Sequence, residues 1–398
     1  MPRSRPSSPI CTGLLLLLCL LATVASGTPD DTTDTNVRTH ENNRGRAVHQ
    51  QNSAVPIKSP TTTDDGLAFL VLGDWGGREW WPYSTLAQVR TASGMAKIAT
   101  RQNSTFVLAL GDNFYSHGQA TPKRFAATYQ RVYRQPSLQM PWYVCAGNHD
   151  HLGNVTAQLD FHHKDDRWNF PSLFYTVKKK FATTILGPDG RRYQKTMTAE
   201  FVLIDTVVLA GINDHADAAH PSYFDPLTGP RSADESTHYL RWIDHQLSES
   251  TADYLFVAGH YPVYSACSHG NTQYLIDHLE PLMKKYDVTA YLSGHEHCAL
   301  HVERHTIDYI LTGTGDECCY GGSNVDRLPD DAHLQYLLSD ERNPHGAVGG
   351  FVSVTTATDG EARMEVTYHD QGGRELYTTS LYPRRNKGGQ QHGVEKDE

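Results

Sequence analysis

Five short apolar runs in this chain end abruptly at a glycine followed by a polar residue. The apolar runs start at Phe69, Val107, Trp142, Tyr254 and Thr289. The glycine-polar pairs that end them are Gly73-Asp74, Gly111-Asp112, Gly147-Asn148, Gly259-His260 and Gly294-His295. Each run has the length of a buried strand, so the pattern predicts five strands that each carry a polar side chain at the carboxyl end.

Segments with helical spacing of apolar residues lie between these runs. The spacing is seen at Leu86, Val89, Met95 and Ile98, at Tyr239, Leu240, Ile243 and Leu247, and at Leu275, Ile276, Leu279 and Met283. Strands that alternate with helices predict an α/β fold, in which ligands gather beyond the carboxyl ends of the strands. The runs 201–204, 351–354 and 364–368 predict further strands, and therefore a second sheet.

The N-terminus is typical of an export signal. Arg3 and Arg5 precede the apolar run Leu14–Val24, and small residues follow at 25–27. The run is short for a bilayer span, so we expect a signal peptide at 1–27 that is cleaved, with an uncleaved N-terminal anchor as the alternative. We expect no stable transmembrane segment after cleavage, and the hydrophilic tail excludes a C-terminal lipid-anchor signal.

Three further segments follow the signal. Residues 28–65 contain no Phe, Trp or Tyr and cannot bury enough apolar surface to order themselves, so we expect a disordered linker there. We expect one folded domain at 66–385, and a disordered tail at 386–398. The formal net charge of -10 and the lack of a basic stripe argue against nucleic acid as a partner.

Export makes the cysteines and two glycan acceptor sequences informative. Signal cleavage would leave five cysteines, an odd number, and no pairing is predicted from their spacing. The sequences starting at Asn103 and Asn154 permit N-glycans. We expect the protein in the secretory pathway, as a secreted, endosomal or lysosomal protein or one associated with a surface.

The polar residues at and near the expected strand ends mix carboxylate, amide, phenol and imidazole donors. They are Asp74, Asp112, Tyr115, Asn148, His149, His260, His295 and His297. Hard oxygen donors mixed with imidazoles are typical of a transition-metal site rather than of a calcium or magnesium site. The set is larger than one zinc ion can use, so it predicts two metals. Asp112 is the natural bridge, because a carboxylate has two oxygens.

The blocks that contain these residues read GDWGG, GDNFY, GNHD, VAGHYPVYSACSH and SGHEH, in this order. They resemble the five signature blocks of the purple acid phosphatases, which are calcineurin-like metallophosphoesterases. The chain is most similar to the small, animal-type tartrate-resistant acid phosphatases. The likeness extends through 154–158, 201–206 and 381–385, so it covers essentially the whole folded part.

The resemblance implies a four-layer αββα sandwich of two mixed β-sheets flanked by helices, the metallophosphoesterase fold. It also implies a ligand set for each of two metal ions. The ligands implied for a trivalent iron are Asp74, Tyr115 and His297, with Asp112 as the bridge. Those implied for a divalent ion, which is iron, zinc or manganese in relatives, are Asn148, His260 and His295.

Tyr115 favours the iron-containing branch of the family. A phenol ionises near pH 10 in solution and needs a strong Lewis acid to ionise below that, and its anion prefers a hard trivalent ion. Such an ion should also lower the pKa of bound water below the value of about 7 seen with zinc. We therefore expect a metal-bound hydroxide to attack phosphorus in line, in mildly acidic solution.

Two histidines outside the ligand set match family histidines placed near the phosphate and the leaving oxygen. These are His149 and His269. Imidazole is largely protonated below about pH 6.5, so either side chain can donate a proton to the leaving alkoxide. We expect both to be catalytic, and the sequence does not say which of them protonates the leaving group.

The expected function is that of an acid phosphatase acting on phosphate monoesters, either small molecules or phosphoproteins. The same metal core serves many substrates in this fold, so a phosphodiesterase or nucleotide phosphohydrolase is the alternative enzyme. A secreted binding protein that kept the fold and lost catalysis is the alternative from another class.

Several other features have less specific interpretations. We expect Asp205 to be a hydrogen-bonded structural carboxylate, and His151, His162 and His163 to lie on the surface. We expect the segment 80–83, Trp-Trp-Pro-Tyr, to pack rather than to form an aromatic rim that selects the leaving group. We expect the segment 213–236 to limit access to the site, as a loop does in relatives.

Overall fold

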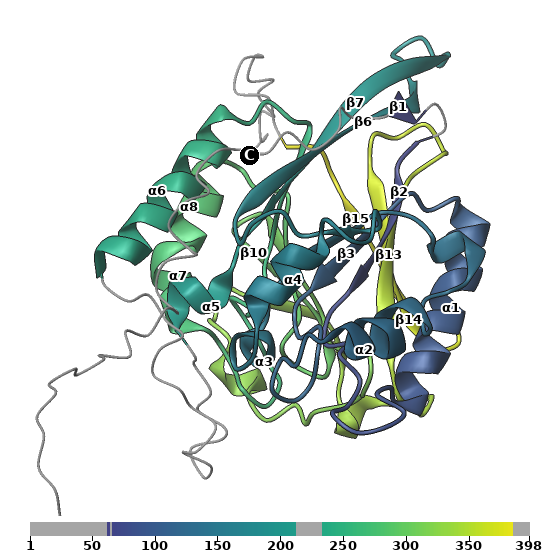
Figure 1. Cartoon of the computed structure of the whole chain (residues 1–398). Coiled ribbons are helices and arrows are strands. Elements are labelled where there is room, and N and C mark those ends of the chain that lie inside the picture. The colour runs from purple at the N-terminus through teal and green to yellow at the C-terminus, as the bar shows by residue number, and fades with distance from the viewer. Residues whose placement is uncertain (1–61, 64–65, 212–232, 385–398) are drawn as a thin grey trace, which may run out of the picture. The chain divides into compact units, whose positions relative to one another are not determined.

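The computed structural model of the protein describes residues 62–63, 66–211 and 233–384 (Figure 1). The expected signal peptide 1–27, most of the expected linker 28–65, and the expected tail 386–398 lie outside the described residues. Within the range expected as linker, Thr62–Thr63 form the short strand β1. No helix in the described ranges combines the length and the apolar content that a bilayer crossing needs.

One sheet has seven strands in the order β15-β14-β13-β2-β3-β4-β5. The strands are β2 (Ala68–Leu72), β3 (Val107–Leu110), β4 (Trp142–Cys145), β5 (Trp168–Asn169), β13 (Gly350–Thr356), β14 (Met364–Asp370) and β15 (Glu375–Leu381). The pairs from β2 to β5 are parallel, while β2, β13, β14 and β15 pair antiparallel. The sheet is therefore mixed, and the polar residues after β2, β3 and β4 leave it at the same edge.

The second sheet has eight strands in the order β1-β6-β7-β8-β9-β11-β10-β12. Besides β1, the strands are β6 (Tyr175–Leu186), β7 (Arg192–Leu203), β8 (Tyr254–Ala258), β9 (Ala290–Ser293), β10 (Ala299–Arg304), β11 (Ile307–Thr312) and β12 (His333–Leu338). The strands β7, β8, β9 and β11 run parallel to one another. The carboxyl ends of β8 and β9 therefore lie side by side.

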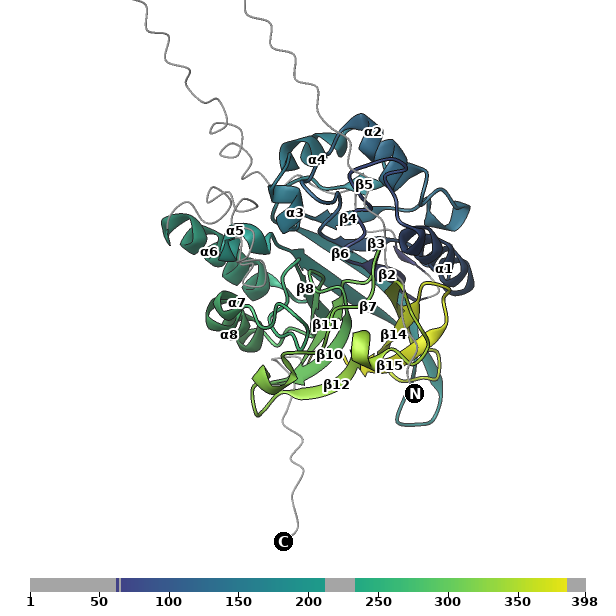
Figure 2. The same cartoon turned by 90° about the horizontal axis from the view of Figure 1, so that it is seen from below.

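Helices cover the outer face of each sheet, and the two sheets lie between them (Figure 2). The helices are α1 (Leu86–Gln102), α2 (Pro122–Arg124), α3 (Asn148–His151), α4 (Val155–Phe161), α5 (Thr206–Ala210), α6 (Ala233–Glu249), α7 (Gln273–His278) and α8 (Glu280–Lys285). A π-helical segment spans Phe125–Gln130, and 3-10 turns span Pro136–Leu138, Val325–Arg327 and Asp340–Arg342. Helix α1 packs on β2 and β13, whereas α6 packs on β7. The expected four-layer αββα sandwich is confirmed.

Aromatic side chains fill the space between the two sheets. Phe69 on β2 stacks on Phe106 with ring centroids 4.8 Å apart, and Phe201 on β7 stacks on Phe256 at 4.8 Å. Phe69 meets Phe201 edge to face at 5.2 Å, and all four rings are buried. Such edge-to-face contacts hold aromatic cores in a defined geometry, so they fix how the two sheets face each other.

The ends of α1 follow from its local sequence. Thr85 precedes the helix, and its side chain accepts a hydrogen bond from the Gln88 N–H at 2.9 Å. Asn103 ends the helix in the left-handed conformation, which asparagine tolerates better than most residues. Met95 and Ile98 are buried as their spacing predicts, whereas Leu86 and Val89 are exposed, because Gln88, Thr91 and Ala92 occupy the buried face at that end of the helix.

The other expected elements form, with two differences. The helix expected around 275–283 is divided into α7 and α8, because Pro281 cannot continue the hydrogen bonding of a single helix. Strand β7 begins at Arg192, nine residues before the expected start at Phe201. Its polar outer half pairs with β6 in a long hairpin, and that half carries no apolar run to signal a strand.

His369 predicts how stability changes with pH. This buried side chain contacts Ser353 Oγ through Nε2 at 2.9 Å and stacks on Phe351, and burial lowers its pKa to about 4. Imidazole in the unfolded chain has a pKa of about 6.5. As the pH falls from about 6.5 to 4, the unfolded state therefore binds this proton first, and the free energy of unfolding should fall by up to about 3 kcal/mol.

Denaturant unfolding at several pH values would test this expectation, with His369→Gln as the variant. Glutamine can keep a hydrogen bond to Ser353 but has no proton to bind, so the fall in stability between pH 6.5 and 4 should be smaller than in the wild type. The exposed His163→Gln serves as the control and should leave the slope unchanged. An identical slope in His369→Gln would contradict the assignment.

Candidate metal centre

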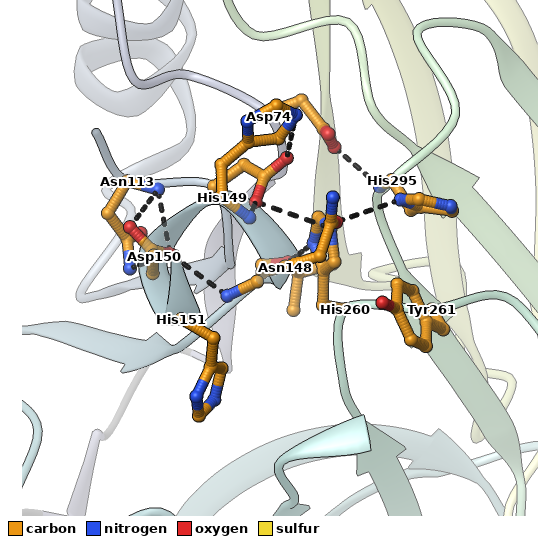
Figure 3. A network of polar contacts seen from close by, with 12 residues as sticks. Asp74, Asn113, Asn148, His149, Asp150, His151, His260, Tyr261 and His295 are labelled. Carbon is orange, nitrogen blue, oxygen red and sulfur yellow. Dashed lines mark hydrogen bonds and ion pairs between the residues drawn. The ribbon is translucent and has the colours of Figure 1, made fainter. Parts of the chain in front are cut away.

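Asp74, Asn148, His260 and His295 come together where the carboxyl ends of the two parallel strand groups meet (Figure 3). Asp74, Asp112 and Asn148 follow the neighbouring strands β2, β3 and β4 of one sheet. His260 and His295 follow the neighbouring strands β8 and β9 of the other. Hydrogen bonds cross between the sheets here: Gly73 N–H donates to Thr312 O at 2.9 Å, and His295 N–H donates to Asp74 Oδ2 at 2.7 Å.

Glycine next to the polar residues permits this close approach. A Cβ on Gly294 would lie 2.5 Å from Asp74 Oδ2, and a Cβ on Gly147 would lie 2.5 Å from the Asp112 backbone nitrogen. Asp74, Asp112 and His295 themselves have φ values of 55°, 51° and 75°, which L-residues rarely adopt. Such conformations cost about 1 kcal/mol or more each and persist where the surrounding structure imposes them, often at functional sites.

Three of the expected ligands form one group. Tyr115 Oη donates to Asp74 Oδ1 at 3.0 Å and lies 2.9 Å from His297 Nε2. His297 Nε2 lies 3.7 Å from Asp74 Oδ1. Phenol, carboxylate and imidazole donors therefore converge within one small volume, and all three side chains are buried.

The other expected ligands form a second group around Asn148. Its Oδ1 lies 2.9 Å from His260 Nε2 and 3.1 Å from His295 Nδ1. The Nδ1 of His260 must carry a hydrogen, because it lies 2.8 Å from the carbonyl oxygen of Leu110, which can only accept. That hydrogen bond leaves the Nε2 lone pair directed into the site, the arrangement that a metal-ligating histidine needs.

Asp112 joins the two groups. Its Oδ1 lies 3.5 Å from His260 Nε2, and one ligand atom each of Asp74, Asp112 and His260 all lie within 4.8 Å of one another. The two carboxylates are 0% and 1% exposed, so both are removed from water. Buried carboxylates this close together, faced by imidazoles, fit a site for positive ions.

The charges of the protein alone are poorly balanced in this site. Burial and then the Asp112 charge raise the pKa of Asp74 well above its usual range. Burial also raises the pKa of Tyr115 well above its usual value, with Asp112 and Asp74 adding to the rise. The pKa of His295 is lowered well below its usual value by burial and by the neighbouring histidines. Cations at this position would offset the cost of ionising Asp74 and Tyr115, and the lowered pKa of His295 keeps its imidazole in the neutral form that binds a metal.

Asp150 and Glu296 hold the ligand loops in place. Asp150 is fully buried and accepts hydrogen bonds from the N–H groups of Gly147, Asn113 and Phe114 at 2.9 to 3.2 Å, and from Gln158 Nε2 at 2.8 Å. It therefore connects the loop after β3 to the loop after β4. Both acidic residues lie inside signature blocks, but sequence reasoning missed them, because it examined the blocks for metal ligands only.

Glu296 fixes the loop that carries His269. Its Oε1 accepts from Ser265 Oγ at 2.7 Å and from the N–H groups of His269 and Gly270 at 2.9 Å. Its Oε2 lies 3.1 Å from His269 Nδ1, and the ring of His269 lies 4.4 Å from that of His295. The structure therefore brings His269 to the site, although it lies outside the strand-end residues.

His149 lies at the open side of the site. Its side chain is 32% exposed, its Nδ1 lies 2.5 Å from Ser116 O, and its Nε2 lies 3.9 Å from Asp112 Oδ2. The carbonyl of Ser116 can only accept, so Nδ1 carries the hydrogen and Nε2 is the nitrogen that faces Asp112. The His149 N–H donates to Asp112 Oδ1 at 3.0 Å, which fixes the backbone beneath the ring.

Two residues after β11 also contact the first group. Tyr320 stacks on the His297 ring with centroids 4.6 Å apart, and Glu317 Oε2 lies 3.7 Å from His297 Nδ1. Sequence reasoning missed both, because they follow a glycine-rich run that reads as a turn. A disulfide joins Cys318 to Cys319 between them, and a second disulfide joins Cys267 to Cys298.

Other expectations near the site have mixed outcomes. Asp205 is a hydrogen-bonded structural carboxylate as expected, because its Oδ1 accepts from the Val208 N–H at the start of α5. The prediction that His151 lies on the surface is wrong: its side chain is 11% exposed, and its Nε2 lies 2.7 Å from Asp205 Oδ2. Residues 213–232 of the expected access-limiting segment lie outside the described residues.

The prediction that Trp80 and Trp81 pack is also wrong. Their exposed fractions are 63% and 79%, so both residues are mainly exposed to solvent. The turn that carries them holds both rings away from the core. Tyr83 at the end of the same segment is half-buried, as expected for a packed residue.

Comparisons with known proteins agree with this arrangement. The sequence profile of the calcineurin-like phosphoesterases matches residues 67–299. The tartrate-resistant acid phosphatase type 5 of Rattus norvegicus is 35% identical over 323 residues, which cover 80% of this chain and 91% of the rat protein.

Two solved structures share the fold. The first is GAP50, described as the anchor in the inner membrane complex of Plasmodium, with a TM-score of 0.62 and 23% identity over 81% of this chain and 90% of that one. The second is the purple acid phosphatase PPD1 from yellow lupin seeds, with a TM-score of 0.52 and 14% identity over 80% of this chain and 54% of that one.

The anchoring role of Asp150 can be tested with Asp150→Asn in metal-free protein. An asparagine amide has only one acceptor oxygen, so at least one of the buried N–H groups from Gly147, Asn113 and Phe114 would lose its acceptor. We expect the free energy of unfolding to fall by about 2 to 4 kcal/mol in denaturant titrations. The exposed Asp160→Asn is the control and should change it by less than about 0.5 kcal/mol. Equal stability of the two variants would contradict the role.

Proposed function

Because the chain belongs to the calcineurin-like phosphoesterase family, in the group that contains the tartrate-resistant acid phosphatases, we propose that it is an acid phosphatase that hydrolyses phosphate monoesters at a pair of metal ions. The observation that carries this proposal is the convergence of two donor groups on Asp112. Burying a pair of carboxylates faced by imidazoles is costly without cations, which supports a metal centre rather than a structural cluster.

We assign one metal to each donor group. Asp74, Tyr115 and His297 would hold a trivalent iron, because an anionic phenol and a carboxylate suit a hard ion. Asn148, His260 and His295 would hold a divalent iron, zinc or manganese, and Asp112 would bridge the two. Bound ions would supply positive charge that neutralises phosphoryl oxygens and lowers the pKa of water, which makes water a nucleophile for in-line attack in acidic solution.

The residues of the chain contribute proton transfer and positioning. His149 holds its Nδ1 hydrogen on Ser116 O, so its Nε2 is placed to give a proton to the leaving oxygen at the open side of the site. His269 holds its Nδ1 on Glu296, so its Nε2 is the nitrogen that can exchange a proton with a bound substrate. Glu296 and Asp150 keep both rings in position without touching the substrate.

Several features support export as the setting of this activity. Disulfides persist in oxidising compartments, and the described residues contain two of them, with Cys145 as a buried free thiol. Asn103 and Asn154 are exposed, so both acceptor sequences are open to N-glycans. We propose a signal peptide at 1–27, a linker that ends before β1, a catalytic domain that runs from β1 (Thr62–Thr63) to residue 385, and a tail at 386–398.

Substrate comparison tests the reaction class. With metal-loaded protein near pH 5, kcat/KM for phenyl phosphate should exceed that for diphenyl phosphate by at least about tenfold, because a monoester offers the metal pair three non-esterified oxygens and a diester only two. Adenosine monophosphate and triphosphate identify a nucleotide-specific enzyme if they are much better substrates than phenyl phosphate. Faster hydrolysis of the diester, or no hydrolysis of any ester, would overturn the proposal.

The iron assignment can be tested by spectroscopy with Tyr115→Phe. Purified wild-type protein should contain two transition ions per chain and show a visible tyrosinate-to-iron absorption band, which the variant should lose. Tyr368→Phe is the control, since this buried tyrosine lies on β14 and donates to Leu300 O, and its band should be unchanged. Fewer than two ions per chain, or a band that persists in Tyr115→Phe, would refute the assignment.

A further inference from the structure

A short turn next to the candidate metal centre presents two tryptophans to solvent. It runs from Glu79 to Tyr83, and its exposed rings are Trp80 and Trp81. Tryptophan carries the largest apolar surface of any side chain, and two adjacent exposed rings give up the stabilisation that burial would bring. Exposed aromatic pairs of this kind are typical of surfaces that bind something.

The turn is held at its first end. The Glu79 side chain bonds His117 Nδ1 and also accepts from the N–H groups of Ser116 and His117, and these contacts lower the pKa of Glu79, the His117 bond most. The preceding residues are fixed as well, because Gly76 O accepts from the Tyr115 N–H at 3.2 Å and from Arg124 Nη2 at 2.9 Å.

The turn is also held at its second end. Tyr83 N–H donates to Trp80 O at 2.8 Å, and Tyr83 O accepts from Thr128 Oγ1 at 2.8 Å. The Lys123 ammonium and the Arg124 guanidinium lie 4.7 and 5.5 Å from the centroid of the Tyr83 ring. Both ends are therefore anchored, so the two tryptophans project from a defined backbone and lose little entropy on binding a ligand.

The anchor at Glu79 places the turn beside the proton donor of the proposed reaction. Ser116, whose N–H contacts Glu79, is the residue whose carbonyl holds His149 Nδ1. Two contacts therefore connect the residue before Trp80 to the ring that faces the leaving oxygen. The turn that carries the two tryptophans is therefore anchored to the same residue that orients His149.

The charge around the turn suits an anionic substrate. Arg78 lies with its guanidinium carbon 6.0 Å from the Trp80 ring centroid, and Lys123 lies at the other end of the turn. These cations stand out on a chain with a formal net charge of -10. Positive charge beside exposed aromatic rings favours a ligand that combines a negative group with a flat ring.

We infer that Trp80 and Trp81 are specificity-determining residues that stack on the aromatic ring of a phenolic leaving group, and so select aryl phosphate monoesters over alkyl ones. The inference rests on the proposed function, because the leaving group is defined by phosphate bound at the metal centre. Phosphate would be held at the metal centre, so the two rings would act on the leaving group alone. The shared chemistry is a phenol ester of phosphate, whether in a small molecule or on a tyrosine side chain.

Kinetics on two substrates test the inference. The metal-loaded double variant Trp80→Ala/Trp81→Ala should lose roughly three- to tenfold in kcat/KM for phenyl phosphate, the range expected for one aromatic contact. Its kcat/KM for glycerol 2-phosphate, which has no ring, should change less than about twofold. Trp80→Phe/Trp81→Phe should restore most of the loss, because phenylalanine can still stack.

A matched control is available in Tyr382→Ala. This tyrosine is 61% exposed. Arg384, two residues later, donates its backbone N–H to Asp253 O, which directly precedes the amino end of β8. Because the site lies at the carboxyl end of β8, Tyr382 is at the opposite end of the sheet. The variant should leave both substrates unchanged. An equal loss on both substrates in the double alanine variant, or no loss on either, would overturn the inference while leaving the phosphatase proposal intact.

A binding measurement separates this inference from the proposed function. Phenylphosphonate, which cannot be hydrolysed, should quench tryptophan fluorescence of the wild type, and the double alanine variant should lose most of that quenching. Methylphosphonate, which has no ring, should quench neither. If the wild type hydrolyses no ester but phenylphosphonate still quenches through these two rings, the phosphatase proposal fails, selection of a leaving group fails with it, and the tryptophans are a binding site for the aryl ring alone. Absence of that quenching in an active enzyme would overturn the aromatic site alone.

A phosphotyrosine peptide and phenyl phosphate then identify the source of the ring. If kcat/KM for both substrates falls by the same factor in the double alanine variant, the tryptophans contact only the phenol ring. If only the peptide loses activity, the selectivity for phenyl phosphate fails and the inference is overturned, because peptide residues beyond the ring would carry the contact.

Discussion

The repulsion between two buried carboxylates governs this structure. Asp74 and Asp112 lie within 4.8 Å of a common histidine nitrogen and of each other, and water is excluded from both. The effective cost of burying even one such charge amounts to several kcal/mol, and imidazoles that are themselves driven toward neutrality by burial offset little of it. The surrounding loops must therefore be held in place by other interactions until a cation compensates the charge.

That support comes from the backbone and from two further acids. Glycines let the strand ends of the two sheets approach to hydrogen-bonding distance, while Asp74, Asp112 and His295 adopt unfavourable φ values. Asp150 and Glu296 offset this strain, because each accepts several hydrogen bonds from loop groups that would otherwise be buried without partners. The acidic residues of this region thus divide into two kinds, those that face the site and those that fasten the loops around it.

Much of the fold was predictable because buried strands and their ends have recognisable local sequence patterns. An apolar run that stops at a glycine can be recognised in the amino-acid sequence. The bounds of β2, β3, β4, β8 and β9 could therefore be predicted to within about one residue. The outer half of the β6–β7 hairpin was not, since its residues are polar on both faces and owe their strand conformation to pairing. The division of α7 from α8 depends on Pro281, whose effect the apolar spacing conceals.

The ligand residues were predictable for the same reason, while their supporting contacts were not. A ligand sits directly at a strand end, but the partners of Asp150 or Glu296 are brought near by loop paths that sequence spacing does not encode. The same limit explains the errors at His151 and at Trp80 and Trp81. On average, histidine is less often buried than tryptophan, and the predictions followed these averages. Only the tertiary structure shows that His151 is largely buried and that Trp80 and Trp81 are exposed.

The split of the donor atoms between two sheets has a mechanical consequence. Asp74, Asp112, Tyr115 and Asn148 come from one sheet, whereas His260, His295 and His297 come from the other. Any ion held by both sets would cross-link the two sheets. Separation of the sheets on unfolding and dissociation of the ion would then be coupled. Changes that weaken metal binding should therefore also lower the thermal stability of the protein. A variant that lacked the ligand residues would lose this stabilisation as well as its activity.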